Sequence, residues 1–118
     1  MKQKQALKAY TTIIAMGKRV RGKAAFGLFR LKKDLKEVID FQAEEEMKLI
    51  EKYGGTIMEG GIVTIEDEEK RLAFLKEKEE LGEMDIDQEI NPVTIGTDSI
   101  TDINIWEIEA LEGFVNFE

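Results

Sequence analysis

The side chains that most often perform acid–base catalysis, nucleophilic attack and zinc binding are missing from this sequence. None of its 118 residues is a histidine or a cysteine. The usual general base, the thiolate nucleophile and the commonest zinc ligands are therefore absent. The serine and threonine hydroxyls that remain have no histidine to activate them. We expect a protein that is not an enzyme and that needs no cofactor.

Three carboxylates at alternate positions form the best candidate for a metal site. In the segment "DIDQE", the side chains of Asp85, Asp87 and Glu89 would share one face of an extended strand. Carboxylate oxygens are suitable ligands for Mg²⁺ or Ca²⁺. The alternative is that the interleaved apolar residues face the core while the acids face water. No calcium-loop pattern surrounds the segment, so we expect no metal site and keep the three acids as candidates for partner binding.

Basic residues gather near the N-terminus, in and after the glycine-bracketed segment "GKRVRGK" at residues 17–23. Cations beside an aromatic ring can bind phosphates and stack on bases. They can also contact an acidic protein surface, or pair with acids of the same chain. A further alternative is that the first helix covers the aromatic ring. The candidate partner-binding residues here are Lys18, Arg19, Arg21, Lys23, Phe26, Arg30 and Lys33.

The charges divide the chain into two halves of opposite sign. Residues 1–36 contain eleven Lys/Arg and one acid, whereas residues 37–118 contain six Lys/Arg and twenty-four acids, for an overall charge of −8. The acidic half either solvates helix and strand surfaces or imitates the phosphates of DNA. Because its negative charge opposes the approach of DNA, we do not expect direct nucleic-acid binding.

Apolar periodicity predicts two helices in the first half of the chain. Residues 6–16 have helical spacing, and residues 23–53 place one apolar stripe along a rod of about 45 Å. The stripe ends at Gly54–Gly55, a helix stop signal. It contains Ala24, Leu28, Leu31, Leu35, Val38, Ile39, Ala43, Met47 and Ile50.

Shorter elements are predicted after the long helix. In residues 54–66, β-forming side chains alternate with other residues on both sides of Glu59-Gly60-Gly61. This pattern predicts a β-hairpin. Residues 67–81 predict a helix that pairs antiparallel with the long one, and residues 84–95 look extended because Pro92 excludes a helix interior. We expect Thr101 or Asp102 to cap a last amphipathic helix. Its apolar side would contain Ile103, Trp106, Ala110 and Phe114, and we expect Trp106 and Phe114 to be core anchors rather than a docking hot spot.

These elements predict an α+β fold in a single domain over residues 1–118. It would consist of a helical hairpin, a small β-hairpin with an extended segment, and a C-terminal amphipathic helix. No apolar run approaches the roughly 20 residues that span a bilayer, and no signal peptide is evident. We therefore expect a cytosolic protein that does not bind membranes.

The order of these elements resembles a family of small uncharacterised phage and prophage proteins of low-GC Gram-positive bacteria. The similarity rests on "GKAAFGLFRLKKDLKEVIDFQAEEEMKLIEKYGG", the acidic helix, "EINPVTI" and "IWEIEALEGFV". It implies a viral accessory or assembly protein, and the family provides no catalytic residues to transfer.

The function that we expect is protein binding. The resemblance and the charge polarity favour a phage-encoded module that inhibits or redirects a bacterial defence or nucleic-acid-handling complex in the host cytoplasm. Its partner would be a host protein or a second copy of itself. The alternative is a virion structural or assembly protein that forms a repeating self-contact.

Overall fold

The computed structural model describes all residues from 1 to 118 and shows a mixed helical and strand fold. This confirms the predicted α+β class. The helices are α1 (Gln3–Met16), α2 (Gly22–Lys52), α3 (Glu68–Glu83) and α4 (Ile105–Ala110), with one-turn 3₁₀ helices η1 (Glu59–Gly61) and η2 (Thr97–Ser99). The strands are β1 (Thr56–Ile57), β2 (Val63–Thr64), β3 (Val93–Ile95) and β4 (Val115–Phe117).

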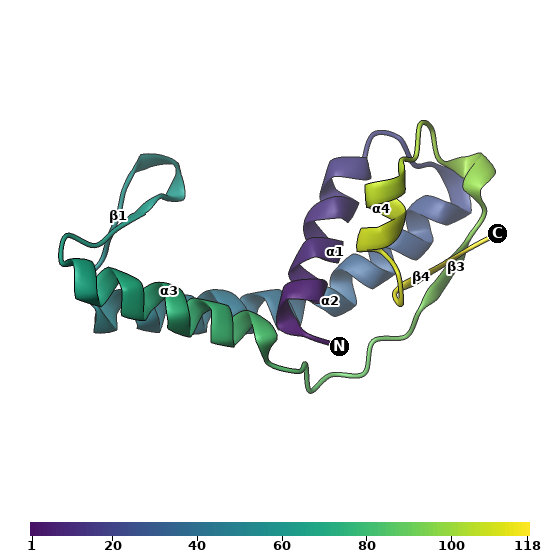
Figure 1. The fold of residues 1–118 in the computed structure, drawn as a ribbon. Helices are drawn as coiled ribbons and strands as arrows, with labels where there is room; N and C mark the ends of the chain where they lie inside the picture. The colour runs from purple at the N-terminus through teal and green to yellow at the C-terminus, as the bar shows by residue number, and fades with distance from the viewer.

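The elements form a globular head from which a long helical arm projects (Figure 1). The molecule measures 51 × 29 × 21 Å along its principal axes. In the head, α1 and β3 pack on the first half of α2, and α4 lies against α1. β3 and β4 pair in parallel, with Val93 opposite Val115 and Ile95 opposite Phe117. One cluster of 14 buried apolar residues, drawn from these elements and the connections beside them, forms the core of the head.

The arm consists of the second half of α2 and the antiparallel α3, which confirms the predicted helical hairpin (Figure 1). Asp67 caps α3, since its carboxylate accepts a hydrogen bond from the Lys70 amide at 3.0 Å. The predicted β-hairpin is also present at the far end of the arm, where β1 and β2 pair antiparallel. Ile50, Ile65 and Phe74 form a second, much smaller buried cluster there.

The apolar stripe of α2 does not face a single partner. Its residues are buried from Ala24 to Val38 and again at Ile50, but Ala43 and Met47 between them are exposed. The head covers the stripe in the first half of the helix, and α3 contacts the second half from another side. The sequence predicted one continuous buried stripe, which is wrong at these two positions because the partner changes along the helix.

The C-terminal helix begins later and is shorter than the sequence predicted. Asn104, and neither Thr101 nor Asp102, is its N-cap, and it forms a capping box with Glu107. The helix has six residues, and after Gly113, whose φ is 83°, the chain continues as the unpredicted strand β4. The pairing of β4 with β3 is a long-range interaction, which local propensity cannot indicate.

The two predicted core anchors of this region have different environments. Phe114 is buried, but it lies beyond the helix. Trp106 is 53% exposed, so its prediction as a core anchor is wrong. Because α4 is short, the head buries only its Glu107 and Ala110, together with Leu111 at its end. None of the four helices is both long and apolar enough to cross a membrane.

Candidate protein-interaction surface

Arg19 in the basic loop pairs with the acidic C-terminal region of the same chain. Its Nη1 donates to Glu107 Oε1 at 3.0 Å and to the carbonyl oxygen of Asp102 at 3.0 Å, and its Nη2 donates to Glu107 Oε2. The Glu107 carboxylate is fully buried and also accepts a hydrogen bond from the Asn104 amide at 3.2 Å. This forked geometry satisfies a carboxylate that would otherwise be costly to bury.

The surroundings of this ion pair favour the charged state of both groups. Hydrogen bonds from the Arg19 guanidinium hold the pKa of Glu107 below its usual value, against the opposing effect of burial. Asp102 has a φ of 55°, in the left-handed region, and presents its carbonyl oxygen to Arg19. The backbone of the loop is also fixed, because the Thr101 amide donates to the Arg19 carbonyl at 2.9 Å.

The remaining candidate cations of the loop and of α2 have no ion-pair partner. All of them are exposed, and none lies within ion-pair distance of a carboxylate: Lys18, Arg21, Lys23, Arg30 and Lys33. The sequence left open whether the basic segment contacts its own acidic half. The structure shows that Arg19 makes this contact and that the five others are free.

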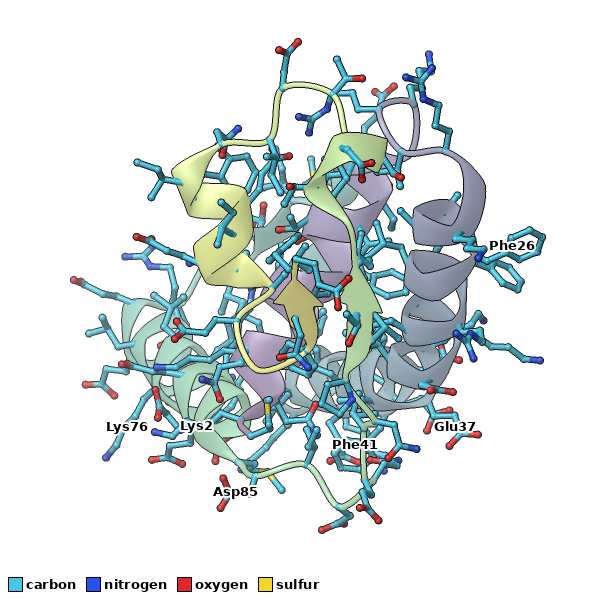
Figure 2. The ribbon with its side chains drawn as sticks, turned by 90° about the vertical axis from the view of Figure 1, so that its right-hand side faces the viewer. Lys2, Phe26, Glu37, Phe41, Lys76 and Asp85 are labelled. Carbon is cyan, nitrogen blue, oxygen red and sulfur yellow. The ribbon has the colours of Figure 1, made fainter.

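Two phenylalanines lie among these free cations on the first turns of α2. Phe26 is 75% exposed and Phe29 is 62% exposed. The alternative in which the first helix covers Phe26 is therefore wrong, and Figure 2 shows Phe26 pointing into solvent. Large apolar side chains next to unpaired charges on a folded surface are typical of an interaction site. We call Lys23, Phe26, Phe29, Arg30 and Lys33 the cationic face.

A shallow apolar groove adjoins the cationic face where α1 meets α2. Its volume is about 210 Å³. Phe29 belongs to both surfaces, and Lys32 lies at the edge of the groove with its ammonium 6.0 Å from the centre of the Tyr10 ring. The groove could hold apolar side chains of a partner. It is lined by Ile13, Ile14, Gly17, Val20, Ala25, Leu28, Phe29 and Lys32.

The three acids of the "DIDQE" segment lie elsewhere, in the connection between α3 and β3. Asp85, Asp87 and Glu89 are exposed, whereas the interleaved Ile86 and Ile90 pack partly buried against the core of the head. Of the two arrangements considered for this segment, the structure has the one in which the acids face water. Nowhere in the chain do three or more acids gather as a metal site would require. Figure 2 shows Asp85 far from Phe26, so the two sets of candidate residues form separate surfaces.

Several exposed apolar residues were not selected from the sequence. Phe29 follows Phe26 by three positions and lies outside the leucine stripe, a signal that could have identified it. Ile105 and Ile108 on α4 are exposed as well, beside Trp106, which was expected in the core. Their exposure depends on where the head places α4, which the sequence alone does not reveal.

Comparisons with known proteins found no match, whether with protein-family models, curated proteins or solved structures.

Proposed function

We propose that this chain is a non-enzymatic, phage-encoded protein-interaction module that binds an acidic surface of a bacterial host protein through the cationic face. The observation that supports this proposal most directly is the pair of exposed phenylalanines among unpaired cations. Aromatic and Arg side chains are the residues that contribute most to protein–protein binding. The cations would steer the approach of an acidic partner and set the orientation of the complex.

The distribution of charge favours a protein partner over nucleic acid. The arm and the C-terminal region contain almost all of the acids, and Glu37 and Asp40 follow the cationic face on α2 itself. A nucleic acid extending beyond the cationic face would meet these carboxylates. A compact acidic protein surface can fit on the face without doing so.

The cellular role that we propose is inhibition or redirection of a host defence or nucleic-acid-handling complex. It is supported by the resemblance to phage proteins of Gram-positive bacteria and by the separation of basic and acidic residues into two halves of the chain. The acids Asp85, Asp87 and Glu89 would provide a separate contact on the same complex. Neither contact requires a metal or a cofactor.

The experiment is affinity capture from a lysate of a low-GC Gram-positive host, with and without nuclease treatment, followed by binding measurements on the purified captured protein. The wild type is compared with Phe26→Asp/Phe29→Asp and with Arg30→Glu/Lys33→Glu. A matched control is Lys70→Glu/Arg71→Glu, which reverses two cations of the arm that form no ion pair. The separate acidic surface is tested with the triple variant Asp85→Asn/Asp87→Asn/Glu89→Gln.

We expect the wild type and the control to bind one host protein equally, and both variants of the cationic face to bind it at least tenfold more weakly. Loss of a central aromatic side chain typically costs about 2 kcal/mol or more of binding free energy. Equal binding by all variants would show that the cationic face is not the binding site for the host protein. Capture that disappears with nuclease treatment would assign the face to nucleic acid.

A second candidate function is that of a virion assembly protein with a repeating self-contact. The observation that favours it is the 51 Å length of the molecule together with exposed Ile57, Met58 and Ile62 at the end of the arm. Stoichiometric amounts of the chain in purified particles, with no captured host protein, would support this role over the first.

A further inference from the structure

The exposed side of α4 has the same residue pattern as the cationic face, with the charges reversed. On α2, Phe26, Phe29, Arg30 and Lys33 are exposed at positions i, i+3, i+4 and i+7. On α4 and the turn that follows it, the exposed residues at the same spacing are Ile105, Ile108, Glu109 and Glu112. Residues at this spacing share one side of a helix, which applies to Ile105, Ile108 and Glu109, whereas Glu112 lies in the turn beyond the end of α4. Each stripe therefore presents two apolar side chains followed by two charges.

No other part of the molecule covers either stripe. Ile105 is 76% exposed and Trp106, beside it, is 53% exposed. Glu109 and Glu112 form no ion pair, and neither do Arg30 and Lys33. The two stripes thus have unpaired charges of opposite sign next to uncovered apolar side chains.

We propose that the α4 stripe of one copy of this chain docks on the cationic face of a second copy. A parallel alignment of the two helices places Ile105 and Ile108 against Phe26 and Phe29. The same alignment places Glu109 and Glu112 near Arg30 and Lys33. Trp106 adds an aromatic side chain at the edge of the contact, and the apolar groove beside Phe29 can receive part of it.

The placement of the stripes determines the kind of assembly. In Figure 2, α4 and the first half of α2 lie on opposite sides of the head, and Phe26 points away from α4. One copy therefore cannot use both stripes on the same neighbour through a two-fold axis. The contact is heterologous, and it produces chains or rings that grow head to tail.

The strength of the contact follows from its size. One face of a short helix buries less surface than the roughly 1,200 Å² at the lower limit of standard stable interfaces. We therefore expect association that depends on concentration and weakens with salt, since the charged residues lie at an exposed rim.

This inference goes beyond the proposed function, because it gives the cationic face a second occupant that competes with the host protein. The test is sedimentation velocity of the purified full chain over a range of concentrations, at about 50 mM and about 500 mM salt, which differ strongly in charge screening. Three variants are compared with the wild type. They are Arg30→Glu/Lys33→Glu, Glu109→Lys/Glu112→Lys and the arm control Lys70→Glu/Arg71→Glu.

We expect the wild type and the arm control to form species larger than dimers, and each face variant alone to associate at least tenfold more weakly. The chain carrying all four reversals, Arg30→Glu/Lys33→Glu/Glu109→Lys/Glu112→Lys, should assemble again, because its stripes are complementary once more. Restoration of this kind is not expected if the substitutions merely damage the fold. All four residues are exposed, so circular dichroism and melting temperature should be unchanged.

The outcomes separate the inference from the proposed function. A wild type that stays monomeric at all concentrations, yet binds a captured host protein through the cationic face, would overturn the self-contact alone. Assembly that none of the variants affects would overturn it too. A monomer that binds no partner through the cationic face would contradict both proposals.

Discussion

Arg19 differs from the other cations of its loop because the tertiary structure surrounds it with acceptors. Its guanidinium reaches the buried Glu107 carboxylate and the Asp102 carbonyl, whereas Lys18 and Arg21, on either side of it, extend into solvent. The loop therefore contains two kinds of basic residue. One stabilises the fold, and the others are free to bind a partner.

Substitution of Arg19 by methionine should destabilise the protein strongly. It would leave the Glu107 carboxylate buried without its cation, which typically costs about 3–5 kcal/mol in the free energy of unfolding. Arg21→Met, in the same loop but exposed and unpaired, should change this free energy by no more than about 0.5 kcal/mol. Urea denaturation monitored by circular dichroism measures both values. Similar losses in the two variants would contradict the structural role of the Arg19–Glu107 pair.

Glu83 should make stability depend on pH at the acidic end. Hydrogen bonds from Lys2 and Lys4 lower the pKa of its carboxyl to about 2, whereas the pKa in the unfolded chain is about 4.3. A lowered pKa in the folded state adds stability above the unfolded value, and this stability is lost as the pH falls through the folded value.

The difference in urea midpoint between the wild type and Glu83→Gln should therefore be largest near neutral pH. It should shrink steadily as the pH falls from about 5 to about 2. Glu89→Gln, whose carboxyl is exposed and forms no ion pair, is the matched control. A difference that is independent of pH would show that the ion pairs of Glu83 do not stabilise the fold.

At the scale of the elements, α2 links two hydrophobic clusters of very different size. The head cluster contains 14 buried residues and the distal cluster only three. Regions with few buried contacts open more readily than the rest of a domain. The end of the arm, with the β-hairpin, should therefore unfold locally without unfolding the head.

Phe74→Ala should reveal this difference between the two clusters. Phe74 is the buried member of the distal cluster that lies on α3, so its truncation removes apolar contact that holds α3 to the end of α2. Amide hydrogen exchange should become faster throughout residues 50–74 and remain unchanged in α1 and β3. Leu72→Ala, an exposed neighbour, is the control. Faster exchange throughout the head would indicate a single cooperative unit.

At the scale of the molecule, the head and arm make the protein more extended than its length requires. Its radius of gyration is 16.6 Å, compared with about 13.5 Å for a compact domain of this many residues. An arm of this kind adds surface for contacts but only a small core. Most of the stability of the molecule should therefore come from the head.

A chain in which a short Gly/Ser turn replaces residues 44–79 should still fold. The 14 residues of the head cluster lie between Ala6 and Val38 and between Ile95 and Val115, outside the deleted segment. We expect a cooperative thermal transition and dispersed methyl resonances in NMR spectra. Loss of both would show that the arm is needed to form the head.

The sequence was sufficient to predict the helices, the β-hairpin and the polarity of charge. Helical periodicity, the acidic first turn of α3 and the Glu59-Gly60-Gly61 turn are local signals, and the structure contains the elements that they predict. Among the candidate site residues, Phe26, Arg30 and Lys33 do share one exposed face of α2. Helical spacing alone was enough to place them together.

Other features depended on contacts between residues distant in the sequence. The parallel pairing of β4 with β3, the bond between Arg19 and Glu107 and the exposure of Trp106 are all set by how the head packs. In these cases several conformations satisfy the local preferences almost equally well. Local sequence determined the elements and their charges, and only burial in the tertiary structure decided which cation is paired and which apolar faces remain uncovered.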